Sequence, residues 1–134
     1  MSDRLTLMIV HAHPDDEVIG TGGTFARYND EGVRTVLVTA TLGEEGEIVV
    51  PELNTPEVKA RLAELRREEL RKATAIIGIA HQEFLGYRDS GMVGTPSNQH
   101  PECFHQADLG EATGRLVKLI RAYRPQVLVS YKYR

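Results

Sequence analysis

The sequence has 134 residues, of which 41% are hydrophobic, so we expect one domain with enough apolar side chains for a core and no room for a second domain. The formal net charge is -3 and the basic residues form no long run, so we expect no nucleic-acid partner. The one cysteine, Cys103, excludes an internal disulfide, and the N-terminal apolar run is too short to cross a bilayer, so the sequence predicts a cytoplasmic protein without a membrane partner.

The first part of the chain predicts a strand, a helix and a second strand. The apolar run from Leu5 to Val10 is typical of a buried strand. From Val18 to Glu31 apolar positions recur at helical spacing, and Gly32 is typical of the residue just past a helix end. The segment from Val33 to Leu42 is rich in β-branched residues and predicts a second buried strand.

The rest of the chain continues this alternation between polar loops and periodic segments. The predicted elements are a glutamate-rich loop over 43–56, an amphipathic helix over 57–77, a short strand over 82–85, a long loop over 86–106, a helix over 108–123 and a strand over 126–131. This βαβαβαβ order predicts an α/β fold, with a Rossmann-like, mostly parallel sheet and helices on both of its faces.

The five residues from His13 to Glu17 place one imidazole and three carboxylates directly after the first strand, where open α/β sheets have their active sites. His13 can offer a neutral ring nitrogen and Asp16 an oxygen to a divalent metal, and Pro14 stiffens the turn between them. Asp15 is then placed to act as general base on metal-bound water. The alternative is that these carboxylates only cap the following helix, and spacing alone leaves both interpretations open.

The string His11-Ala12-His13-Pro14-Asp15-Asp16-Glu17 resembles the opening motif of the LmbE-like, or PIG-L, family of zinc-dependent N-deacetylases. Further matching segments extend the resemblance over essentially the whole chain. They are Thr41 to Glu47, Arg66 with Glu69-Leu70, Arg88 to Met92, and Arg124 to Val127. They look like the branch that deacetylates N-acetylglucosaminyl-inositol or cleaves mycothiol conjugates, and the resemblance implies an LmbE-like domain over 1–134.

The resemblance implies a zinc site, although the sequence does not distinguish zinc from other divalent metals. It makes His13 and Asp16 zinc ligands and Asp15 the general base. It gives His11 no ligand role, and because His11 alternates with His13 along the strand we expect His11 to be a buried, hydrogen-bonded histidine.

A third zinc ligand comes, in the family, from a Gly-His-Pro-Asp-His segment soon after the last predicted strand. This sequence ends at Lys132-Tyr133-Arg134 instead. We therefore expect either a domain that is incomplete at its C-terminus or a short relative that completes its site from elsewhere. In the second case the ligand is His100, His105 or a residue of a neighbouring subunit in a homo-oligomer.

The resemblance also suggests that Glu47, Arg66 and Asp89 lie around the polyol part of an aminosugar substrate. Each has an alternative role. Glu47 is then a solvated loop residue, Arg66 a partner of Glu69 or Asp89, and Asp89 a turn residue.

The resemblance thus implies a metal-dependent hydrolase that removes an acyl group from the amine of an N-acetylglucosamine conjugate, such as N-acetylglucosaminyl-inositol or a related thiol conjugate. The alternative is a non-catalytic α/β module that keeps the fold and binds a sugar or a metal weakly.

Overall fold

The computed structural model describes residues 4–131, and the departure from the family pattern at Lys132 lies outside them. The elements are β1 (Thr6–His11), α1 (Asp16–Asp30), β2 (Arg34–Thr41), α2 (Pro56–Ala60), α3 (Leu62–Ile77), β3 (His81–Tyr87), α4 (Leu109–Tyr123) and β4 (Val127–Val129), with short 3-10 turns at Pro51–Leu53, Pro96–Gln99 and Phe104–Gln106. Among these helices none is long and apolar enough to cross a membrane.

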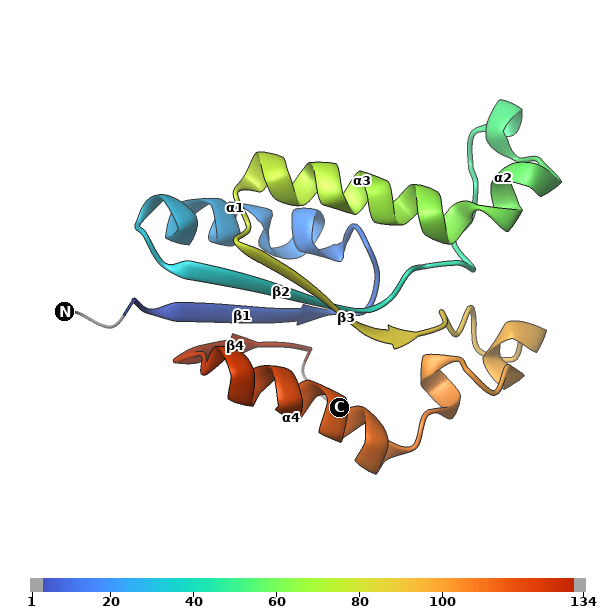
Figure 1. Cartoon of the computed structure of the whole chain (residues 1–134). Coiled ribbons are helices and arrows are strands. Elements are labelled where there is room, and N and C mark those ends of the chain that lie inside the picture. The colour runs from blue at the N-terminus through green and yellow to red at the C-terminus, as the bar shows by residue number, and fades with distance from the viewer. Residues whose placement is uncertain (1–3, 132–134) are drawn as a thin grey trace.

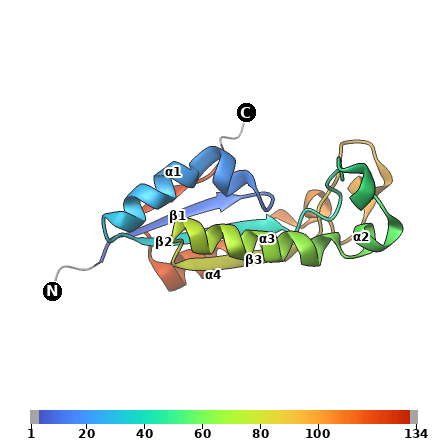
Figure 2. The same cartoon turned by 90° about the horizontal axis from the view of Figure 1, so that it is seen from above.

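The four described strands form one parallel sheet in the order β3-β2-β1-β4, as the predicted α/β fold requires. Figure 1 shows α1 and α3 over one face of the sheet and α4 over the other, and Figure 2 shows α1 and α3 side by side. The chain adds β2 and β3 on one side of β1 and then returns to place β4 on the other side. The order therefore reverses at β1 and β4, and open α/β sheets bind ligands at such a switch point, beyond the carboxyl ends of the strands.

The core has two layers because side chains of β1 alternate between the faces of the sheet. Met8 and Val10 face α4, whereas Leu7 and Ile9 pack with Phe25 of α1 on the opposite face. Phe25 is fully buried, so its truncation to alanine should cost about 3–5 kcal/mol. These layers hold β1 rigidly, and they fix the loop that follows it.

The predicted single helix over 57–77 is wrong, because the structure divides it at Arg61. Thr55 caps α2 by accepting a hydrogen bond from the Val58 amide at 3.3 Å, and α2 ends at Ala60. The apolar spacing continues through the break, so periodicity does not reveal it. Helix α3 ends as predicted at Gly78, which adopts a left-handed conformation.

The end of β3 is irregular. Its pairing with β2 shifts register between Thr39 and Thr41, which pair with Phe84 and Tyr87. The strand thus carries one extra residue at this point, a bulge of the kind that redirects side chains next to active sites. The strand continues past the predicted end at Leu85, and the bulge brings its last residues to the same sheet edge as the loop after β1.

Candidate active site

The loop between β1 and α1 is held by its own carboxylates. The His13 amide donates to Oδ2 of Asp16 at 2.9 Å, and the Asp15 amide donates to Oε2 of Glu17 at 3.0 Å. Asp15 occupies the N-cap position with φ of 133°, yet its side chain makes no capping hydrogen bond. Because such a positive φ is strained for a residue with a Cβ, helix capping does not explain this loop.

His13 lies between two carboxylates. Its Nε2 is 3.2 Å from Oδ1 of Asp89, and its Nδ1 is 3.8 Å from Oδ2 of Asp16. Since the Asp89 carboxylate can only accept, Nε2 carries the hydrogen in the neutral ring, and the lone pair of Nδ1 is left on the side of Asp16. A carboxylate on the far nitrogen is the usual second partner of a metal-binding histidine.

His13 and Asp89 each stabilise the charged form of the other. The hydrogen bond to Asp89 is the main reason why the pKa of His13 is raised, against the effect of burial. Burial acts to raise the pKa of Asp89, but hydrogen bonds from His13 and from the Gly91 amide outweigh it, so the pKa of Asp89 is lowered. Asp89 is thus an ionised carboxylate in the ordinary pH range.

Asp89 also joins two loops. Its Oδ2 accepts from the Glu45 amide at 3.3 Å, and its own amide donates to Oε2 of Glu44 at 2.9 Å. Its Oδ1 accepts from the Gly91 amide at 3.1 Å, which is the turn-shaping role foreseen as the alternative. The structure therefore gives this buried carboxylate both a local role and a contact with His13.

Arg66 of α3 reaches the loop after β1. Its guanidinium donates to the Pro14 carbonyl at 2.5 Å, to Oδ2 of Asp15 at 2.9 Å and to the Gly43 carbonyl at 2.9 Å. The carboxylate that pairs with Arg66 is therefore that of Asp15. The alternative partners, Glu69 and Asp89, form no described hydrogen bond or ion pair with Arg66. This arginine ties the predicted general base to two loops at once.

The structure does not bring Glu47 into this cluster. Its side chain is exposed, and no described hydrogen bond or ion pair involves it. Glu45 is engaged instead, through hydrogen bonds with Arg88 and with Oγ of Ser97. In the sequence, the only indication of the Glu45–Arg88 contact is that these oppositely charged residues follow the neighbouring strands β2 and β3.

The side chains of Tyr131 and His11 lie next to Asp16, a contact that the sequence did not predict. The hydroxyl of Tyr131 donates to Oδ2 of Asp16 at 2.8 Å and lies 3.2 Å from Nδ1 of His11. Burial, the main cause, and the bond to Asp16 raise the pKa of Tyr131 to about 12. His11 is buried and its other nitrogen contacts Thr21, as predicted for a buried, hydrogen-bonded histidine. Cys103 is likewise a buried free thiol.

His13 and Asp16 could supply part of the ligand set of a divalent metal ion. Nδ1 of His13 lies 3.8 Å from Oδ2 of Asp16, so the imidazole and this carboxylate are close enough to bind one zinc ion together. Within residues 4–131 no three His, Cys, Asp or Glu side chains form a metal-sized group, so neither His100 nor His105 joins the pair. The described residues therefore supply two ligands of the three usual in catalytic zinc sites.

Comparison with known proteins gives consistent matches. The family model described as PIG-L, GlcNAc-PI de-N-acetylase, matches residues 8–134. A relative from Catenulispora acidiphila, named 1D-myo-inositol 2-acetamido-2-deoxy-alpha-D-glucopyranoside deacetylase 1, is 55% identical over 93% of this chain and 41% of its own length. The chain spans less than half the length of the curated relatives it matches.

Two solved structures have the same fold over most of the chain. The N,N'-diacetylchitobiose deacetylase from Pyrococcus horikoshii has a TM-score of 0.70 and 27% identity, and the match covers 94% of this chain and 40% of that one. The 4-carboxy-2-hydroxymuconate hydratase from Pseudomonas putida has a TM-score of 0.69 and 28% identity, over 92% of this chain and 45% of that one. Since their reactions differ, the fold alone does not decide the chemistry.

Proposed function

The chain belongs to the PIG-L family of GlcNAc-PI de-N-acetylases, and from this we propose that its site serves the hydrolysis of an amide on the amino group of an N-acetylglucosamine conjugate. The observation that carries the proposal is the meeting of His13, Asp15 and Asp16 with Asp89 and Arg66 at the switch point of the sheet. The names of the relatives favour an inositol conjugate, and a related thiol conjugate is the neighbouring substrate class.

We propose zinc as the cofactor, held by Nδ1 of His13 and the carboxylate of Asp16 together with a ligand from outside the described residues. When bound, zinc lowers the pKa of a water molecule and polarises an amide carbonyl. Asp89 contributes by keeping the hydrogen of His13 on Nε2, so that Nδ1 stays free to bind.

Asp15 is the proposed general base. Its side chain is 58% exposed, so water and substrate can reach it. Arg66 engages only Oδ2, which fixes the carboxylate and leaves Oδ1 to accept a proton. In the reaction Asp15 takes a proton from the attacking water, whose oxygen bonds to the acyl carbon. As the carbon–nitrogen bond breaks, the proton passes from Asp15 to the leaving amine.

The sugar-binding residues remain a proposal. Glu47 has an exposed carboxylate that can accept hydrogen bonds from paired hydroxyls. Arg66 has five N–H donors, of which the protein acceptors use three, so it can still donate to a substrate oxygen. Asp89 is more deeply buried than Glu47. Its carboxylate oxygens already accept hydrogen bonds from His13 and the loop amides, so a substrate hydroxyl would have to share these oxygens.

The test combines metal analysis with an amine-release assay on N-acetylglucosaminyl-inositol, using the purified chain. We expect one zinc per chain and amine release that is lost in Asp15→Asn. If neither zinc nor release is found while circular dichroism shows a folded α/β protein, the catalytic proposal is wrong for this chain. The alternative, a non-catalytic sugar-binding module, then predicts measurable binding of the same conjugate by calorimetry.

A further inference from the structure

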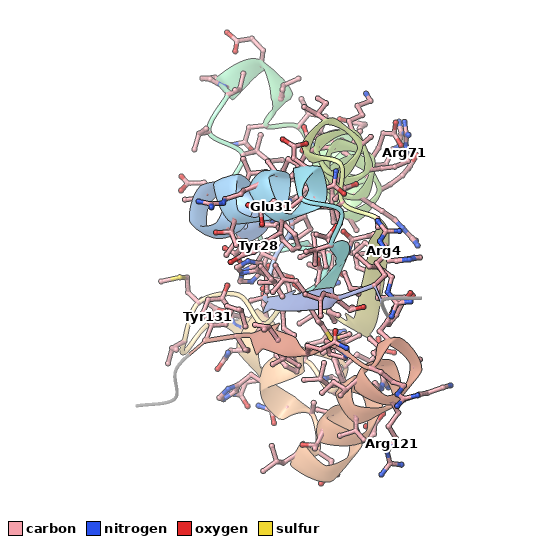
Figure 3. The ribbon with its side chains drawn as sticks, turned by 90° about the vertical axis from the view of Figure 1, so that its left-hand side faces the viewer. Arg4, Tyr28, Glu31, Arg71, Arg121 and Tyr131 are labelled. Carbon is pink, nitrogen blue, oxygen red and sulfur yellow. The ribbon has the colours of Figure 1, made fainter. Side chains whose placement is uncertain are left out.

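Tyr131 follows β4, and its hydroxyl contacts the last residue of β1, His11, and the first residue of α1, Asp16. It lies 115 positions from Asp16 in the sequence, yet its hydroxyl donates to Oδ2 of Asp16 at 2.8 Å. Figure 3 labels Tyr131 beside β4 and Tyr28 on α1. The contact thus crosses the switch point of the sheet, from the end of β4 to the start of α1.

His11 and Thr21 hold the Tyr131 hydroxyl in place. The Thr21 hydroxyl lies 2.9 Å from Nε2 of His11 and 3.0 Å from the Glu17 carbonyl, and it can donate its hydrogen to Nε2. Because the Tyr131 hydroxyl gives its single hydrogen to Asp16, its 3.2 Å contact with His11 requires the hydrogen of the neutral ring to be on Nδ1, which donates to the Tyr131 oxygen. The two rings also meet edge to face, with centroids 5.7 Å apart.

The Asp16 carboxylate is fixed on one oxygen as a result. Oδ2 accepts both the Tyr131 hydroxyl at 2.8 Å and the His13 amide at 2.9 Å. Two donors on one oxygen define the plane of the carboxylate, and they leave Oδ1 free of these bonds. Such fixed orientation is what second partners of metal ligands provide.

We propose that Tyr131, held by His11 and Thr21, is a positioning residue that orients the Asp16 carboxylate for metal binding. Tyr131 itself touches neither substrate nor reacting atoms in this role. The proposal rests on the proposed function in one respect, namely that Asp16 is a metal ligand.

The first test compares Tyr131→Phe with the wild-type chain. Cobalt(II) absorption titrations give the metal dissociation constant, and removal of the hydroxyl should weaken binding about 10–100-fold. The matched control is Tyr28→Phe, because Tyr28 is a partly exposed tyrosine of α1. The control should bind cobalt like the wild type, and the melting temperature of both variants should stay close to that of the wild type. Equal affinity in Tyr131→Phe and wild type would overturn the proposal.

A second measurement needs no metal. The amide proton of His13 bonds to the same Asp16 oxygen as Tyr131, so its NMR chemical shift reports the orientation of the carboxylate. It should move in metal-free Tyr131→Phe and stay unchanged in Tyr28→Phe. If the wild-type chain binds no cobalt, the metal part of the proposed function fails, whereas the His13 amide still decides whether Tyr131 orients Asp16. An unmoved amide overturns that orienting role.

Discussion

Arg66 and Asp15 form an ion pair between residues 51 positions apart, with Nη2 of the arginine 2.9 Å from Oδ2 of the aspartate. The Arg66 side chain is largely buried, whereas that of Asp15 is more than half exposed. The exposed carboxylate of Asp15, the proposed base, is thus fixed by a buried cation that also binds two backbone carbonyls. An exposed carboxylate held in this way keeps one orientation while it remains open to water.

Asp15→Asn should abolish most of the activity without removing the metal. The amide cannot take a proton, and general-base catalysis contributes about 10²–10⁴-fold, so kcat should fall by that factor. Zinc content should be unchanged because His13 and Asp16 remain. Asp30→Asn, at the exposed end of the same helix, is the matched control and should keep full activity. A loss of zinc in Asp15→Asn would instead make Asp15 a ligand.

Arg66→Ala should reduce both stability and activity. It leaves the Pro14 and Gly43 carbonyls without their donor, and loss of such hydrogen bonds costs about 1–3 kcal/mol of unfolding free energy. Activity should fall as well because Asp15 loses its fixed orientation. Urea unfolding and the amine-release assay measure the two effects. Arg121→Ala is the control, since Arg121 is an exposed arginine of α4 on the other face of the sheet.

Gly43→Ala should displace Arg66. Gly43 has φ of 67°, and a Cβ placed there would lie 1.9 Å from Nη1 of Arg66. Gly32 is the matched control because its φ is 80° and a Cβ there meets no atom within 4 Å. Gly32→Ala should therefore cost only the backbone term, about 1–2 kcal/mol, and Gly43→Ala should cost more. In an Arg66→Ala background the excess at Gly43 should disappear, and additive effects would contradict the clash.

The sequence predicted the sheet and the loop after β1 because both are local patterns. The buried strand β1 is predicted by an apolar run, and His13, Asp15 and Asp16 fall within four consecutive positions. The break at Arg61 escaped prediction because the apolar spacing continues through it. A hydrophobic period reports which side of a helix is buried and does not report whether the backbone is continuous.

The contacts around the site needed the three-dimensional structure. Asp89 reaches His13 across 76 positions, and only the resemblance to a family had marked Asp89 at all. Tyr131 carried no signal, since one tyrosine at the end of a strand is typical of many folds. The bulge in β3 and the return of the chain to β4 create these contacts, and neither follows from the spacing of residues in the sequence.

The His13–Asp89 pair predicts a pH dependence of stability in the metal-free chain. The pKa of His13 is raised above 6.5, so its contribution is fully present below that pH and is lost as pH rises through the raised value. The pKa of Asp89 is lowered below 3.8, so its contribution is present above that pH and is lost as pH falls through the lowered value. The difference in unfolding free energy between wild type and Asp89→Asn should therefore be largest between these limits.

NMR titration of the His13 ring in metal-free protein measures the same effect directly. The ring should titrate above pH 6.5 in the wild type and at a lower pH in Asp89→Asn, which cannot stabilise the imidazolium as an ion pair. Protons and zinc compete for Nδ1, so zinc affinity of the wild type should rise with pH and level off above the His13 pKa. In Asp89→Asn the plateau should begin at a lower pH but lie about 10–100-fold lower in affinity, because the ligand is less basic and less well oriented. The same His13 titration in both proteins would show that Asp89 acts elsewhere.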